Sequence, residues 1–249
     1  LGYDSSLVAA RIDPDRIDAA AAIINRHPGV SHNYRRDHAY NLWYTLAVAP
    51  TSRLGLAHTV ERLHQLSGAM MTRLLPALRV FKIGVHLDMT GESPPEQRGA
   101  DTPSAAAQPP LPPLCEQEIG VVRELQRDLP DTPEPFAEAC ARLDITIEEL
   151  AAATVRMRAA GRLRRIAAVL NHRRAGFGAN AMGVWQAPPE RVQDAGAQMA
   201  SFRAVSHCYQ RPTYPDWPYN LFTMVHGHAR PECEATLAAI RQATGLPAP

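Results

Sequence analysis

The chain has 249 residues, of which 45% are hydrophobic and 20% are charged, and its formal net charge is +1. This composition is typical of a folded protein with one large domain or two ordinary ones, and it excludes a disordered chain. The small net charge argues against nucleic-acid binding through bulk electrostatics, and no apolar run approaches the ~20 residues that cross a bilayer.

Residues 1–89 begin with the pattern of a ferredoxin-like unit. Residues 7–12 form a short apolar run that favours a buried strand, and Asp13-Pro14 then predicts the start of a helix that ends before Pro28-Gly29. Residues 30–36 and 40–48 combine β-branched and aromatic side chains with a short connection, which indicates an antiparallel hairpin.

A second helix and a last strand complete this unit. Thr51 or Ser52 is expected to cap the helix, whose apolar positions recur at helical spacing until Gly68 ends it. Residues 78–87 are expected to form the last strand. The resulting order, β-α-β-β-α-β, predicts a four-stranded sheet with two helices on one face and the other face left for a ligand.

The middle of the chain changes character twice. Residues 90–114 are rich in proline and lack apolar periodicity, so they predict a linker. Residues 115–174 predict three helices followed by a short strand or wing at residues 163–170. This is the pattern of a winged helix-turn-helix, so the overall class is α+β.

Residues 175–249 repeat the first unit, except that the strand equivalent to residues 78–87 is missing, so we expect either that the sequence is truncated or that one sheet edge is left open. The repeat is clearest in the hairpin, where four residues are inserted. The equivalent pairs are Ser31/Ser206, His32/His207, Tyr34/Tyr209, Arg36/Arg211, Tyr40/Tyr219 and Asn41/Asn220. We therefore expect the two units to pair as an intramolecular pseudo-dimer, with further homo-oligomerisation an open alternative.

His, Tyr and Arg alternate along the equivalent strands, so they share one face of each sheet. A lone strand histidine is by default structural, but a pattern used twice on a ligand-facing sheet predicts a binding site. Arginines near a turn are by default solvated, Trp43 is equally well explained as core, and Asn41 and Asn220 fit a role in satisfying hairpin backbone groups.

The cysteines and the basic residues support weaker alternatives. Cys115, Cys140, Cys208 and Cys233 form no CxxC motif and have no histidine pair at zinc spacing, which predicts free thiols, no metal site and a cytoplasmic protein. Seven arginines in and after the third helix suit phosphate contacts, as in a transcription regulator: Arg156, Arg158, Arg162, Arg164, Arg165, Arg173 and Arg174. Glu148 and Glu149 at the start of that helix would repel DNA, so we expect DNA binding to be the weaker interpretation.

Residues 29–44, read with the helical module and the repeated units, resemble a known family. The modules together resemble the Lrp/AsnC regulators, and the string Gly-Val-Ser-His-Asn-Tyr-Arg-Arg-Asp-His-Ala-Tyr-Asn-Leu-Trp-Tyr resembles the siroheme decarboxylases within that superfamily, in the fused two-subunit form of the haem d1 branch. The family pattern also leads us to expect a helical module before Leu1 and a strand after Pro249. Thr213 stands where the first unit has His38.

The resemblance implies removal of the acetate carboxyl groups at C12 and C18 of siroheme, giving 12,18-didecarboxysiroheme and CO2. The iron would come with the substrate, and no other cofactor is implied. His32, His38 and His207 are the candidate catalytic residues, as proton donors, orienting groups or iron ligands. Candidate substrate-binding residues are Tyr34, Arg35, Arg36, Tyr40, Asn41, Trp43, Tyr209, Arg211, Tyr214, Trp217, Tyr219 and Asn220. A non-catalytic tetrapyrrole sensor is a further alternative.

Overall fold

A computed structural model describes residues 2–84, 94, 96–99, 112–163, 166 and 176–247. The chain divides into two compact units. One, the sheet unit, consists of residues 3–106 and 171–249, and the other, the helical unit, is built mainly from residues 107–170. Among the described residues, no helix is long and apolar enough to cross a membrane.

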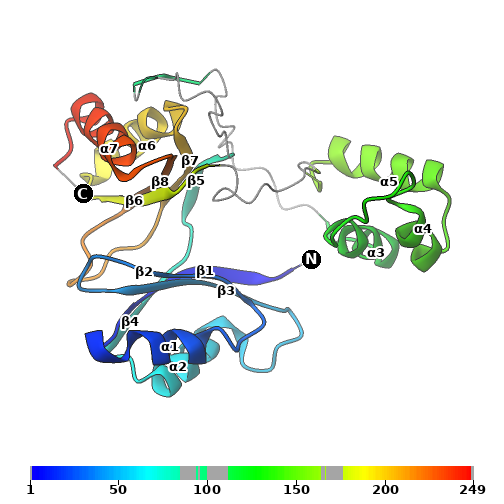
Figure 1. Cartoon of the computed structure of the whole chain (residues 1–249), viewed down its shortest axis with the longest axis horizontal. Coiled ribbons are helices and arrows are strands. Elements are labelled where there is room, and N and C mark those ends of the chain that lie inside the picture. Colours follow the sequence, from blue (N-terminus) through cyan, green and yellow to red (C-terminus); the bar gives the residue numbers. More distant parts are fainter. Residues whose placement is uncertain are drawn as a thin grey trace. The chain divides into compact units, whose positions relative to one another are not determined.

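The first sheet has the antiparallel strand order β2-β3-β1-β4. Its helices α1 and α2 cover one face (Figure 1). In chain order the elements are β1 (Asp4–Arg11), α1 (Ile17–Ile24), β2 (Val30–Arg35), β3 (Leu42–Val48), α2 (Gly55–Ser67) and β4 (Met71–Leu75), with a short 3-10 turn at Pro14–Arg16 before α1. The helix α2 begins three residues after Ser52, whose hydroxyl accepts from the Gly55 amide at 3.3 Å.

The second sheet repeats this plan with α6 and α7 on one face. Its order is β5-β7-β8-β6, and all of its strand pairs are antiparallel. The elements are β5 (Arg79–Ile83), β6 (Ala179–Trp185), α6 (Val192–Ser201), β7 (Val205–Gln210), β8 (Leu221–Gly227) and α7 (Arg230–Thr244), with a 3-10 turn at Pro189–Arg191. The two predicted ferredoxin-like units are thus confirmed.

The prediction that residues 78–87 close the first sheet is wrong. Met71–Leu75 closes it, and β5 instead pairs with β7 of the second sheet. The side chains of β5 explain why it joins the second sheet, because Phe81 is buried in the second core and Lys82 Nζ donates to the Phe202 carbonyl at 2.6 Å. Within the described residues, β6 lies at the other edge of the second sheet.

The helix-free faces of the two sheets share a third hydrophobic cluster. Along β1 the side chains alternate, with Val8 in the core under the helices and Leu7 and Ala9 in this third cluster. We call it the inter-sheet cluster, and its buried members are Leu7, Ala9, Tyr40, Trp43, Leu75, Val184, Trp217 and Phe222. Because it draws on both halves, the halves pack against each other as a pseudo-dimer within one chain.

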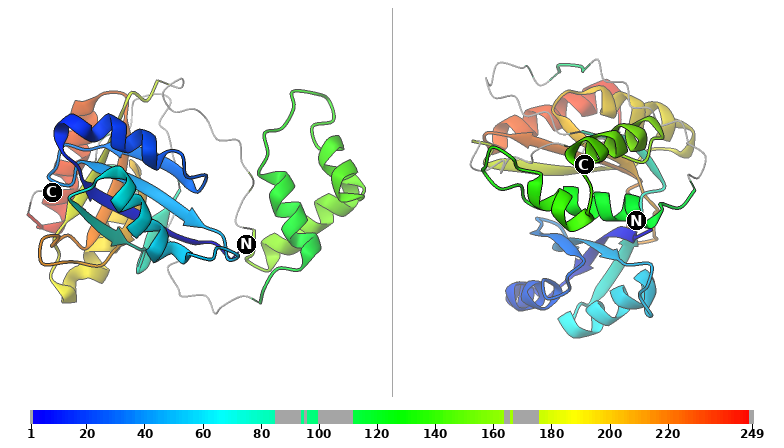
Figure 2. Two further views of the ribbon diagram at one scale, coloured as in Figure 1. Left: turned by 90° about the horizontal axis from the view of Figure 1, so that it is seen from below. Right: turned by 90° about the vertical axis from the view of Figure 1, so that its right-hand side faces the viewer.

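The helical unit contains α3 (Glu116–Leu125), α4 (Ala137–Leu143) and α5 (Ile147–Ala159), drawn in green in Figure 2. Val121, Leu150 and Met157 form the centre of its small core. The helix α5 starts with a capping box in which Thr146 and Glu149 satisfy each other's amides. The predicted wing at residues 163–170 lies largely outside the described residues.

Part of the predicted linker is bound to the second half. The guanidinium of Arg98 stacks 3.6 Å from the centre of the Phe202 ring, and its Nη1 donates to the Gln198 carbonyl at 2.9 Å. The amide of Gly99 donates to the Ser201 carbonyl at 2.8 Å. These contacts attach residues 97–99 to the end of α6.

Candidate functional site

A β-bulge occurs at the same place in both halves. The register of β2 against β3 shifts between Val30 and His32, and that of β7 against β8 shifts between Val205 and His207. A bulge inserts one unpaired residue and changes the direction in which the following side chains point. After the bulge, Tyr34 pairs with Trp43, which belongs to the inter-sheet cluster.

The bulge therefore turns a row of side chains toward the helix-free face of each sheet. In the first row, the His32 and Tyr34 rings are 6.0 Å apart, and the Arg36 guanidinium lies 5.0 Å from the Tyr34 ring. In the second row, made by His207, Tyr209 and Arg211, the corresponding distances are 6.0 Å and 4.7 Å. We call these rows the first and second ladders.

The inserted bulge residue, a serine in both halves, orients the ladder histidine. Ser31 Oγ lies 3.0 Å from His32 Nδ1, and Ser206 Oγ lies 2.9 Å from His207 Nδ1. Ser206 Oγ also donates its proton to the Met224 carbonyl at 3.2 Å. Because a hydroxyl has a single proton to donate, Ser206 accepts from the Nδ1–H of His207.

The two ladder arginines differ in their partners. Arg211 is 8% exposed and its Nη1 donates to the Leu75 carbonyl of the first half, and burial lowers its pKa to about 10. Arg36 is only half-buried and stacks on Tyr34 and on Trp43, at 5.0 and 5.6 Å. Within the described part of the chain, the Arg36 guanidinium has no hydrogen-bond acceptor, and its buried Nε has no partner.

His38 lies in an aromatic surround contributed by both halves. Its ring centre is 5.2 Å from that of Trp217, 6.0 Å from that of Tyr219 and 6.3 Å from that of Trp43. The Tyr40 amide donates to His38 Nδ1 at 3.0 Å, so this nitrogen carries no proton and the neutral ring has its N–H at Nε2. Burial lowers the pKa of His38, which favours the same neutral form.

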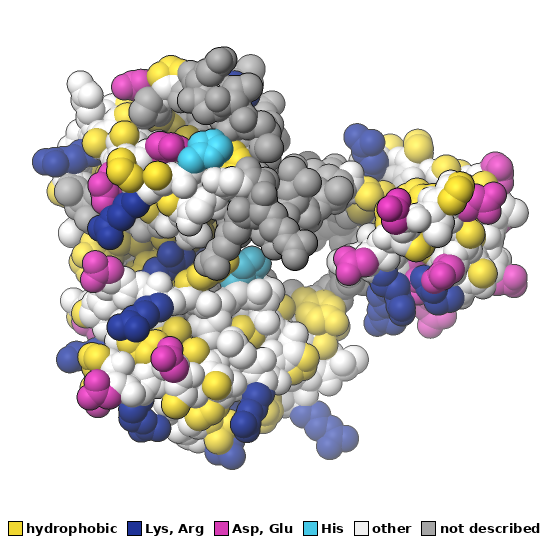
Figure 3. Space-filling model, viewed as in Figure 1, with side chains coloured by type: hydrophobic (Ala, Val, Ile, Leu, Met, Phe, Trp, Pro, Cys, Tyr) yellow, Lys and Arg dark blue, Asp and Glu magenta, His cyan; other side chains and the backbone are white. Residues whose placement is uncertain are grey.

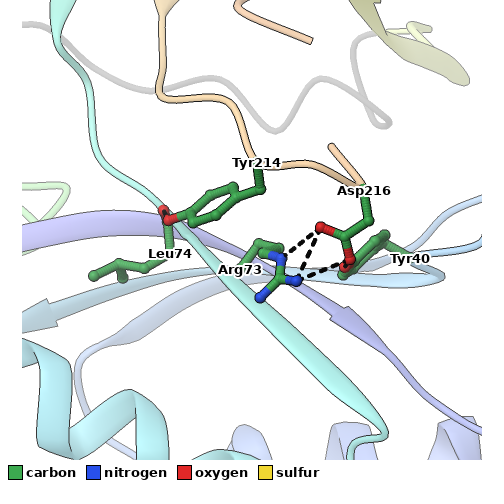
Figure 4. Close-up of polar contacts among 5 residues, drawn as sticks. All are labelled: Tyr40, Arg73, Leu74, Tyr214 and Asp216. Carbon is green, nitrogen blue, oxygen red and sulfur yellow. Dashed lines mark hydrogen bonds and ion pairs between the residues drawn. The ribbon is translucent and has the colours of Figure 1, made fainter. Parts of the chain in front are cut away.

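The four-residue insertion of the second half is a tight turn. Tyr214 and Trp217 exchange two backbone hydrogen bonds of 2.8 and 2.9 Å around Pro215 and Asp216. The Tyr214 hydroxyl donates to the Leu74 carbonyl at 2.6 Å, which anchors the turn to β4 (Figure 4). The inserted turn of the second half is therefore bound to the first.

Asp216 makes the central polar contact of this turn. Its carboxylate accepts two hydrogen bonds of 2.9 Å from Arg73 and a further one from the Tyr40 hydroxyl (Figure 4). The hydrogen bond from Tyr40 holds the pKa of Asp216 below its usual value. Burial, together with the carboxylate, raises the pKa of Tyr40 to about 12, so the phenol stays protonated and remains a donor.

The structure does not bring every predicted site residue to the ladders. Arg35 is exposed and, after the bulge, lies on the opposite face of β2 from Tyr34. Both ends of the Asn41 amide bond the backbone of Ile12 at 2.8 Å, and Asn220 does the same to Ala187 at 2.8 and 2.9 Å. The two asparagines therefore extend the strand pairing, which is the structural alternative for these positions.

The sequence pattern did not single out Arg73, Asp216 or the hydrogen-bonding role of the bulge serines. The Ser-His pair recurs in both hairpins, and this recurrence could have indicated the role of the serines. No sequence pattern indicated Arg73 or Asp216, because they are 143 residues apart and meet only through the packing of the two halves.

Comparisons with known proteins agree with this architecture. Residues 1–82 and 174–249 match the family described as AsnC-like ligand binding domain, and residues 118–164 match the siroheme decarboxylase NirDL-like HTH domain. A siroheme decarboxylase from Hydrogenobacter thermophilus is 41% identical over 99% of this chain and 72% of its own length. The siroheme decarboxylase beta subunit of Methanosarcina barkeri is 42% identical over 52% of this chain and 85% of its own length.

A solved structure is also similar over the whole chain. It is the crystal structure of the siroheme decarboxylase NirDL in complex with an iron-uroporphyrin III analogue, with a TM-score of 0.67 and 34% identity. The similarity covers 100% of this chain and 70% of that one.

Proposed function

This chain belongs to the siroheme decarboxylase family, and we propose that it converts siroheme to 12,18-didecarboxysiroheme by removing the acetate carboxyl groups at C12 and C18, as a step toward haem d1. At each acetate, the bond between the methylene carbon and the carboxylate breaks, CO2 leaves, and a proton takes its place on the carbon to give a methyl group. The iron belongs to the substrate.

The observation that carries this proposal is the pair of ladders on the helix-free faces. Siroheme is a flat ring with many carboxylates, so a site for it needs cations, aromatic faces and a proton donor or acceptor. Each ladder has a guanidinium, which pairs with carboxylates through parallel N–H donors, next to a tyrosine ring. Each ladder ends in a histidine oriented by a serine.

The three candidate histidines are proposed to have different roles. His32 and His207 are equivalent and line the ladders, which suits a proton-transfer or iron-facing role. His38 is half-buried, its Nδ1 already accepts a hydrogen bond, and burial lowers its pKa, which suits a hydrogen-bond donor from Nε2 better than an acid that must carry two ring protons. We therefore propose His38 as the residue that orients a substrate carboxylate.

The substrate-binding assignments follow the same logic. We propose Tyr34, Arg36, Tyr209 and Arg211 as direct contacts, and the rings of Trp43, Tyr214 and Tyr219 as supporting aromatic surface. Tyr40 and Trp217 are fully enclosed between the sheets and are proposed to shape the site from beneath.

The regulator alternative has less support from the helical unit. Glu148 and Glu149 begin α5, and Arg162 is engaged in an ion pair with Glu118. Acidic and basic side chains are intermixed on the face of this unit drawn in Figure 3. Arg164, Arg165, Arg173 and Arg174 lie outside the described residues.

The test is anaerobic incubation of the protein with siroheme, followed by mass spectrometry of the tetrapyrrole. A decarboxylase yields a product that has lost two molecules of CO2, whereas a sensor binds siroheme and returns it unchanged. A gel-shift titration with random-sequence DNA at low salt tests the regulator. Tight DNA binding together with an unchanged siroheme mass would contradict the proposed function.

A further inference from the structure

Two of the differences between the halves along the hairpin meet in the folded protein. Only the first half has a histidine at position 38, because Thr213 is the equivalent residue. Only the second half has the inserted turn Tyr214 to Trp217. The rings of His38 and Trp217 are 5.2 Å apart and meet edge to face.

Trp217 occupies the space between equivalent residues of the two halves. Its ring centre is 5.2 Å from Tyr40 and 5.5 Å from the equivalent Tyr219, and 5.4 Å from Trp43 and 6.2 Å from the equivalent Phe222. A single indole between equivalent positions of two related sheets makes their surroundings unequal. Trp217 is 0% exposed, so this inequality is built into the packing.

A continuous set of contacts links the inserted turn to the His38 ring nitrogen. The Asp216 carboxylate is fixed by Arg73 and accepts from the Tyr40 hydroxyl. The Tyr40 amide, in turn, donates to His38 Nδ1. The turn thus fixes the residue that sets the tautomer of His38, while Trp217 closes one side of the ring.

We propose that Asp216 and Trp217 are positioning residues, through which the second half holds His38 of the first half as a neutral Nε2–H donor in one orientation. This rests on the proposed function of the site. In this arrangement only the first half has such a donor. The inserted turn of the second half then positions a group of the first half, and is more than a surface connection.

Asp216→Ala tests the proposal by kinetics with siroheme under anaerobic conditions. Small displacements of a group that orients the substrate cost up to about 100-fold in rate, so we expect kcat to fall by about 10-fold or more while KM changes by no more than about twofold. Tyr40→Phe removes the same hydrogen bond at its other end and should act in the same direction. Glu138→Ala breaks an exposed ion pair with Arg142 in the helical unit and serves as the matched control, without loss of kcat.

The ¹⁵N signals of the histidine rings provide a readout that a purely structural role would not change. The His38 signals, identified by their loss in His38→Gln, should show a single neutral tautomer protonated at Nε2 in the unmodified protein. In Asp216→Ala they should show a mixture of tautomers. An unchanged kcat, or an unchanged His38 tautomer alongside a lower kcat, would overturn the proposal. The spectra need no substrate, so they test this positioning role even if siroheme proves not to be converted.

Discussion

The two fully buried tryptophans of the sheet unit differ in one hydrogen bond, and this difference predicts their relative sensitivity to substitution. Trp185 and Trp217 are both 0% exposed. Trp185 Nε1 donates to Thr223 Oγ1 at 2.9 Å, whereas Trp217 Nε1 is buried without a partner in the described structure. Replacing each by phenylalanine removes a similar volume, so the cost of the space left behind should be similar.

The hydrogen-bonding terms have opposite signs. In Trp185→Phe, the buried Thr223 hydroxyl loses its donor, which costs about 1–3 kcal/mol. In Trp217→Phe, the same kind of penalty is relieved, because the unpartnered N–H is deleted. We therefore expect Trp217→Phe to be the more stable variant by about 1–3 kcal/mol or more. Trp217→Ala, by contrast, should lower the free energy of unfolding by about 3–5 kcal/mol, because it removes a fully buried ring from the inter-sheet cluster.

Urea unfolding followed by tryptophan fluorescence measures these free energies. The three tryptophans, Trp43, Trp185 and Trp217, all lie in the sheet unit, so the signal reports that unit alone. The midpoint and slope of each variant give the free energy of unfolding. If Trp217→Phe is as destabilised as Trp185→Phe or more, the inference drawn from their hydrogen bonding is refuted.

Three further results are expected. Gly196→Ala should lower the free energy of unfolding of the sheet unit in urea by about 1–3 kcal/mol, because the added Cβ would lie 2.4 Å from the Phe81 ring that anchors β5. Unchanged stability would contradict the assignment of β5 to the second sheet. Burial lowers the pKa of His38 from its ordinary 6.5, so as pH falls below that value the unfolded chain binds a proton more readily than the folded one. The melting temperature should therefore fall less in His38→Gln than in the parent between about pH 7 and about pH 5.5, and equal falls would argue against a lowered pKa of His38. Arg36→Ala should raise the Kd for siroheme in a spectral titration by about 10-fold or more, because a charge-assisted hydrogen bond is lost. The control is Arg62→Ala at an exposed position, and an equally small effect of both variants would show that Arg36 does not contact siroheme.

The repeat in the sequence was enough to predict both units, because local patterns specify their helices and hairpins. The assignment of the strands around Pro76 failed for a physical reason. Met71–Leu75 has only one β-branched residue, whereas residues 78–83 have two and an aromatic, so propensity favours the second segment as the last strand. Propensity does not specify which sheet a strand joins. That choice depends on Phe81 and Lys82 reaching the second core.

The ladders were predictable because strand alternation alone places His, Tyr and Arg on one face. The bulge that turns them to the helix-free face left only the recurring serine as a trace. The role of Asp216 could not be predicted from the sequence, for a different reason. An aspartate beside Pro215 is what a tight turn requires in any case, and its partners Tyr40 and Arg73 are far away in sequence.

The role of the ladder histidines is tested by the mass spectrum of the tetrapyrrole after anaerobic incubation of siroheme with His32→Ala, His207→Ala and the control His58→Ala. His58 is exposed on α2, away from both ladders. We expect siroheme to lose two CO2 with the parent and with the control, and the reaction to stop at siroheme or at a product that has lost a single CO2 in each ladder variant. Conversion at the parent rate by both ladder variants would contradict this role.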